Sequence, residues 1–143
     1  MTGRTVRAAA GLLAVAALAA FAPVNAQVVV SQVYGGGGNS GATLRSDFIE
    51  LRNNGASAVS VQGWSVQYAS SAGSSWQVTA LQGEIAAGGY YLVKQADGAG
   101  GSVDLPAPDA IGTIAMSASN GKVALVLLNP GAAAAPSKQL ALP

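Results

Sequence analysis

Apolar and polar residues alternate in short runs along most of the chain, and glycine and polar residues separate the runs. The alternating runs lie at 27–34, 47–53, 59–69, 74–81, 83–95, 111–118 and 123–128. Period two places successive side chains on opposite faces of a strand, and none of the runs keeps the 3.6-residue period of an amphipathic helix. About seven strands at this spacing predict an all-β sandwich or barrel.

The alternation also predicts which side chains face the core. Ile49 and Leu51 share one side of their strand and are expected to point inward. In the first run, Val28, Val30 and Tyr34 are expected to share one face. Each of these strands would then bury one face and expose the other.

The third run changes phase at Gly63, where an extra residue in a strand predicts a β-bulge or sharp bend. Trp64 and Trp76 lie in alternating stretches and are predicted to fill the core. Glycines at 87–90 and 119–122 predict hairpin turns, since glycine readily adopts positive φ.

The ends of the chain differ from this pattern. Arg4 and Arg7 precede an uncharged apolar run, and small residues lead up to Ala26, which predicts a signal peptide cut after that residue. An uncleaved anchor and an alanine-rich core helix are the alternatives, but the run is shorter than a membrane span. We predict a signal peptide at 1–26, a domain at 27–128, and an Ala/Pro-rich tail or linker at 129–143.

Charge and composition exclude several functions. Without Arg4 and Arg7, five basic and six acidic residues remain, so the mature chain is almost neutral. Its basic residues are scattered, and we do not expect nucleic-acid binding. Cysteine and histidine are absent, which excludes disulfides, a Ser-His-Asp triad, a cysteine nucleophile and the usual zinc sites.

One set of motifs resembles a known family. An acidic residue before "FIEL" and Asn53, a Gly-Trp pair, and Ala-Gly-Gly before a tyrosine-rich strand resemble the lamin-tail domain of secreted bacterial proteins. The resemblance covers about residues 28–127. It implies an immunoglobulin-like antiparallel β-sandwich that serves as an accessory or binding module, often beside nuclease or phosphoesterase domains. Members generally carry further strands where this chain has its Ala/Pro-rich segment, so the sandwich is expected to lack its last strands.

The four glycines at 35–38 raise the question of a phosphate-binding loop. Such a loop commonly precedes a helix and carries a lysine, whereas this one runs into a strand without a lysine. We interpret it as a flexible connection between the first two strands.

Acidic side chains form two further candidates. Glu50 and Arg52 share one strand face and are predicted to pair with each other and with Gln67. Three aspartates lie in or beside one Gly/Pro-rich loop and could bind calcium: Asp97, Asp104 and Asp109. Their spacing, however, fits no known calcium-binding loop. The plainer interpretation is that these aspartates favour turns.

Aromatic residues could form a contact platform for a glycan or peptide. Tyr90 and Tyr91 are adjacent in a strand, so one should face solvent and the other the core. The remaining aromatic candidates are more simply core residues: Trp64, Tyr68 and Trp76.

The sequence therefore predicts a noncatalytic, secreted or cell-surface module, with no catalytic, cofactor-binding or metal-binding residues. Its partner would be a protein or glycan at the cell surface. The chain would have no stable membrane span after signal cleavage. The alternative is the N-terminal accessory part of a secreted nuclease or phosphoesterase whose catalytic domain lies outside this sequence.

Overall fold

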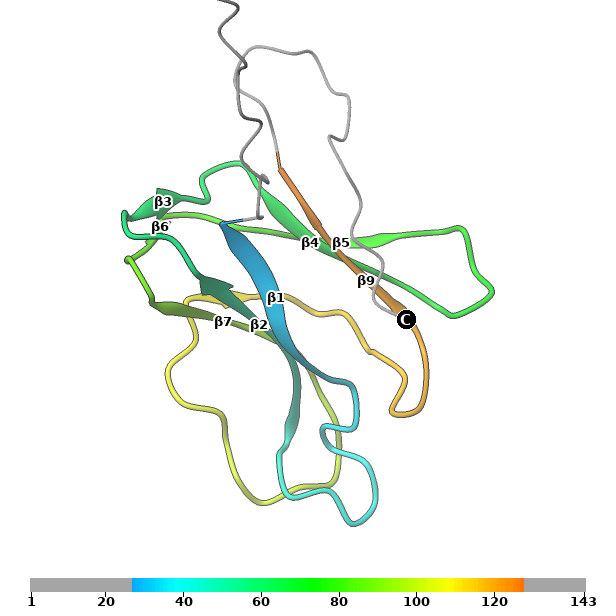
Figure 1. Ribbon diagram of the computed structural model, residues 1–143. Helices are drawn as coiled ribbons and strands as arrows, with labels where there is room; N and C mark the ends of the chain where they lie inside the picture. Colours follow the sequence, from blue (N-terminus) through cyan, green and yellow to red (C-terminus); the bar gives the residue numbers. More distant parts are fainter. Residues whose placement is uncertain (1–26, 128–143) are drawn as a thin grey trace, which may run out of the picture.

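The computed structural model describes residues 27–127, and this part of the chain is all-β, as the alternation predicts (Figure 1). The predicted signal peptide and tail fall on residues outside the described part. No helix among the described residues has the length and apolar character needed to cross a membrane. The strands are β1 (Val28–Tyr34), β2 (Ser46–Asn53), β3 (Val59–Ser60), β4 (Ser65–Ala69), β5 (Gln77–Ala80), β6 (Glu84–Ile85), β7 (Tyr90–Asp97), β8 (Ala110–Ile111) and β9 (Lys122–Val126).

Two sheets form the layers of a sandwich, and a small third sheet joins them at one end (Figure 1). The first has the order β1-β2-β7-β8, the second β5-β4-β9, and the third pairs β3 with β6. Neighbouring strands are antiparallel except for β7 and β8, which are parallel. The chain between β7 and β8 must return along the sheet before it pairs, as a parallel connection requires.

The core lies between the four-stranded and three-stranded sheets. Ile49 and Leu51 are fully buried there, as predicted, together with Val66 from the opposite sheet. Burial of an aliphatic side chain contributes about 1.5–3 kcal/mol, so this cluster supplies much of the stabilisation in a chain without cysteine.

The predicted shared face of β1 is wrong for Tyr34. The pairing with β2 shifts register between Val30 and Gln32, and this bulge turns the later residues to the opposite side. Val28 faces the core and Val30 packs against it. Tyr34 instead stacks on Phe48 on the outer face, with ring centroids 5.5 Å apart.

Gly63 marks the end of one sheet and the start of another. With φ of +77°, it lies in a turn between β3 and β4, which belong to different sheets. The Trp64 amide donates to the Val61 carbonyl across this turn. The sharp bend is therefore confirmed, whereas the continuous strand over 59–69 is wrong.

The two tryptophans have different environments. Trp64 is half-buried and packs against the core. In β5, Thr79 faces inward while Val78 is 58% exposed. Trp76 is half-buried outside the core cluster, and the Lys122 ammonium lies 5.6 Å from its ring centre. The prediction that Trp76 fills the core is wrong.

Of the two predicted glycine turns, the one at 87–90 exists but does not close a hairpin, and the one at 119–122 is wrong. The turn at 87–90 connects β6 to β7, which pair with different partners, and Gly88 has φ of +67°. Around 119–122 the chain bends at Ala118 and Ser119 and enters β9 at Lys122, no strand comes directly before it, and Gly121 does not have positive φ. A turn signal fixes the local backbone path, whereas the pairing partner depends on where the core-facing side chains are buried.

The predicted strand at 111–118 is largely absent, although its apolar residues enter the core. Only Ala110–Ile111 forms a strand, while Ile114 and Met116 are buried. Two backbone hydrogen bonds with β7 hold the start of this segment, from the Gly112 amide to the Lys94 carbonyl and from the Ala96 amide to the Ile114 carbonyl. Side chains hold it further along, because the Ile114 amide donates to Gln95 Oε1 at 3.1 Å and the Met116 amide donates to Asp47 Oδ2 at 2.8 Å. We call residues 112–121 the bridging segment.

Candidate functional site

The glycine-rich loop after β1 is tightly packed and does not form an anion cradle. The Gly37 amide donates to Asp47 Oδ1 at 2.8 Å, and the Gly38 amide donates to the Leu44 carbonyl at 2.9 Å. A Cβ on Gly37 or Gly38 would overlap the backbone of Ser46 or Gly98. The loop connects the first two strands as predicted, but its close packing corrects the expectation of a flexible connection.

The substitution Gly38→Ala is expected to lower the free energy of unfolding by more than about 2 kcal/mol, since it combines an unfavourable φ of +68° with a backbone clash. Gly41→Ala is the matched control, because Gly41 has φ of +81° but nothing near its Cβ position. It should cost about 1 kcal/mol. Urea unfolding followed by tryptophan fluorescence would measure both, and equal losses would contradict close packing.

Asp47 connects three parts of the fold. It is 4% exposed and accepts the Gly37 amide from the loop and the Met116 amide from the bridging segment. Burial raises the pKa of the Asp47 carboxyl, and the two backbone hydrogen bonds partly offset this effect. Its role is structural in the described geometry, because both carboxylate oxygens are engaged.

Two further buried polar groups hold the sandwich together. Asn53, at the end of β2, is fully buried, and its Nδ2 donates to the carbonyls of Ser57, Ile85 and Ala86. Its Oδ1 accepts the Gly55 amide at 2.9 Å. Asn53 therefore joins the end of the four-stranded sheet to β6.

Gln95 and Thr79 form the second polar group, between the two main sheets. Both are buried, and each donates to the other, at 3.0 and 3.1 Å. This pair was not predicted from the sequence.

Asn53 was named from the sequence only as part of a family motif, and its burial was not predicted. Its burial could have been predicted, because period two places Asn53 on the same strand face as Ile49 and Leu51.

The predicted pairing of Glu50, Arg52 and Gln67 is wrong. Glu50 Oε1 accepts the Ser31 hydroxyl at 2.7 Å, while the Arg52 guanidinium lies 5.3 Å from the Tyr90 ring centre. Gln67 belongs to β4 in the other sheet.

The three loop aspartates serve separate local contacts. Asp97 accepts hydrogen bonds from Ser46 and Lys94, and both lower the pKa of its carboxyl. Asp109 accepts the Leu92 amide, and Asp104 pairs with Arg45 at 3.1 Å. Among residues 27–127, no three acidic residues gather as metal ligands.

The two adjacent tyrosines divide between the faces, as predicted. Tyr91 is buried, and its hydroxyl donates to the Gln82 carbonyl at 2.8 Å; burial raises the pKa of this hydroxyl. Tyr90 is 56% exposed on the outer face of the four-stranded sheet. Arg52 and Val29 lie in the same cross-strand row, so we call Val29, Arg52 and Tyr90 the Tyr90 surface.

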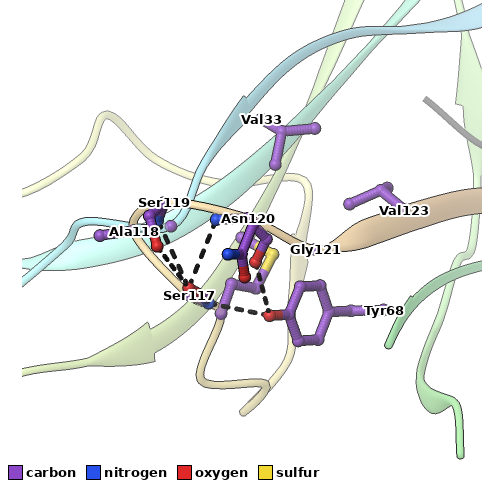
Figure 2. Close-up of a pocket in the computed structure, with 10 residues that line it drawn as sticks. Val33, Tyr68, Ser117, Ala118, Ser119, Asn120, Gly121 and Val123 are labelled. Atoms are coloured by element: carbon purple, nitrogen blue, oxygen red, sulfur yellow. Dashed lines mark hydrogen bonds between the residues drawn. The ribbon is translucent and has the colours of Figure 1, made fainter. Parts of the chain in front are cut away.

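A pocket of about 310 Å³ opens between the end of β1 and the start of β9, and we call it the edge pocket (Figure 2). The Ser117 amide donates to the Tyr68 hydroxyl at 3.0 Å, and this hydroxyl lies 3.5 Å from the Asn120 carbonyl. The remaining walls include apolar side chains from both sheets and the bridging segment: Val33, Met116 and Val123.

These features define an all-β sandwich in which the polar side chains named above mainly hold loops and strands together. The sequence matches the Lamin Tail Domain family over residues 22–138, and the chain belongs to this family of immunoglobulin-like domains. No curated protein matches the sequence. The fold predicted from the resemblance is thus confirmed, whereas the nuclease context stays a prediction.

Proposed function

We propose that this chain is exported and acts as a noncatalytic module that binds a glycan or protein at the cell surface through the Tyr90 surface. The observation that carries this proposal is the exposure of Tyr90 beside the Arg52 guanidinium. An aromatic ring offers stacking area, and a guanidinium offers several hydrogen-bond donors. Both groups sit on a paired sheet, which holds them in place without a ligand.

Export is supported by the way in which the fold begins. The Gln27 side chain donates to the Ser57 carbonyl at 3.2 Å, and the Asn54 amide donates to the Gln27 carbonyl at 2.7 Å. Residue 27 thus takes part in the domain directly after the predicted cleavage position. A cut after Ala26 would leave these contacts intact.

The test expresses the full chain in a bacterium with a general secretory pathway and measures the mass of the exported product. The product should begin at Gln27. Its binding is then measured on isolated cell envelopes, with and without prior protease digestion. Binding that survives digestion identifies a glycan, and binding that is lost identifies a protein.

Tyr90→Ala is expected to weaken envelope binding at least about tenfold, since it removes the exposed ring and its contact with Arg52. Val78→Ala is the matched control, because Val78 is 58% exposed on the other main sheet. It should bind like the unmodified chain. Equal binding by both variants, or no binding by the unmodified chain, would refute this role for the Tyr90 surface.

A further inference from the structure

The edge strands of the two main sheets approach each other on one side of the sandwich (Figure 1). Within residues 27–127, β1 pairs only with β2, and β9 pairs only with β4. The edge pocket lies between these two strands, with Val33 on one side and Val123 on the other (Figure 2). A strand edge carries backbone donors and acceptors that can pair with another extended chain.

The two edges differ as templates for an added strand. β1 has a bulge at Ser31, which interrupts its ladder. β9 pairs with β4 in unbroken register from Lys122 to Val126. A regular edge can pair with an incoming strand over its whole length, so β9 is the better template.

The charge around the edge pocket restricts its occupant. No charged side chain lines the pocket, and Val123–Val126 is entirely apolar. The Lys122 ammonium is engaged with the Gly73 carbonyl and lies over the Trp76 ring. A charged side chain entering here would lose water without meeting an opposite charge, whereas a neutral side chain needs none.

We propose that the edge of β9 to which no strand of residues 27–127 pairs, together with the edge pocket, binds an uncharged, extended peptide segment of a partner protein. The peptide pairs with β9 as an added strand, and one of its apolar side chains enters the pocket between Val33 and Val123. Main-chain hydrogen bonds supply affinity, and the pocket selects the side chain. This site is separate from the Tyr90 surface, which lies on the outer face of the four-stranded sheet.

The test uses nuclear magnetic resonance of the isotope-labelled mature chain and two capped nonapeptides. One peptide alternates threonine and valine, and the other has lysine at the valine positions. The first should saturably shift the amides of β9 and Val33 and slow hydrogen exchange along β9. The lysine peptide should bind at least about tenfold more weakly.

Val33→Lys is expected to weaken binding of the threonine-valine peptide at least about tenfold, because it places a charge in the neutral pocket. Val33 is 39% exposed, so the chain should still fold. Val78→Lys is the matched control and should not change affinity. Should Val33→Lys unfold the chain, Val33→Thr replaces it, with an expected loss of a few fold.

Three results would overturn the proposal: no saturable shifts, shifts confined to the Tyr90 surface, or protection, in the free chain, of the β9 amides that point away from β4. Protection that persists on dilution would identify residues 128–143 as the occupant, and protection lost on dilution would identify a second copy. Tyr90→Ala should bind the peptide normally. The Tyr90→Ala variant can therefore lose envelope binding and still bind the peptide. The proposed role of the Tyr90 surface and the proposed peptide site on β9 are thus tested separately.

Discussion

Asn53→Asp is expected to lower the free energy of unfolding by more than about 4 kcal/mol and to leave much of the chain unfolded at neutral pH. The Asn53 amide donates to three carbonyls, and the side chain is fully buried. An ionised aspartate can only accept hydrogen bonds, so its negative oxygens would be repelled by the carbonyl oxygens. No water reaches this buried position to solvate the charge. Protonation restores one donor, so part of the lost stability should return on acidification.

Asn53→Ala separates loss of the hydrogen bonds from burial of a charge. It removes the same partners without adding a carboxylate, and it should cost about 3 kcal/mol. The stability lost in Asn53→Ala should change little with pH. Asn54→Asp is the matched control, because Asn54 is exposed and only its backbone amide is engaged, with Gln27.

Chemical denaturation at pH 7 and near pH 4, followed by tryptophan fluorescence, would measure these differences. The expected order of stability at pH 7 places the unmodified chain and Asn54→Asp together, then Asn53→Ala, then Asn53→Asp. An Asn53→Asp variant as stable as Asn54→Asp would contradict the buried role of this amide.

The class of fold could be predicted from the sequence because strand burial repeats every second residue. Ile49, Leu51, Tyr90 and Tyr91 all lie on the faces that this period predicts. Local alternation fails where the backbone adds a residue or changes sheet. The bulge in β1 redirects Tyr34, and Gly63 ends one strand pairing before another begins. Sequence spacing alone does not show these events.

The polar contacts were harder to predict, because they join residues far apart in the chain. Asp47 and Met116 are 69 positions apart, and Thr79 and Gln95 belong to opposite sheets. Similarly, Glu50 and Arg52 share a strand face but do not contact each other: Glu50 accepts a hydrogen bond from Ser31, and Arg52 lies over the Tyr90 ring. A side chain's neighbour across a sheet depends on strand order, which one-dimensional spacing does not supply. The candidate surfaces became visible only once the strand order was known.

Asp47 shows how one such contact stabilises a segment that lacks a strand ladder. The bridging segment buries Ile114 and Met116, and the backbone amides of these two residues are held by the side chains of Gln95 and Asp47. The same carboxylate also fixes the glycine-rich loop at Gly37. Loss of Asp47 therefore releases two segments that contribute walls to the edge pocket.

Asp47→Ala is expected to lower the free energy of unfolding by about 3 kcal/mol, because the Gly37 and Met116 amides lose a charged acceptor. Asp104→Ala is the matched control. Its ion pair with Arg45 has side chains that are 79% and 47% exposed, so it should cost less than about 1 kcal/mol. Equal losses in the two variants would contradict the bridging role of Asp47.

The pH dependence gives this prediction a second readout. Burial raises the pKa of Asp47 in the folded chain, so the native state holds its proton more tightly than the unfolded state. The stability of the unmodified chain relative to Asp47→Ala therefore falls as pH rises from the unfolded pKa of about 3.9 through the folded pKa. The difference in the free energy of unfolding between the unmodified chain and Asp47→Ala should be larger near pH 3 than at pH 7. A difference that grows toward neutral pH would mean that the two amide hydrogen bonds outweigh the cost of burying the carboxylate.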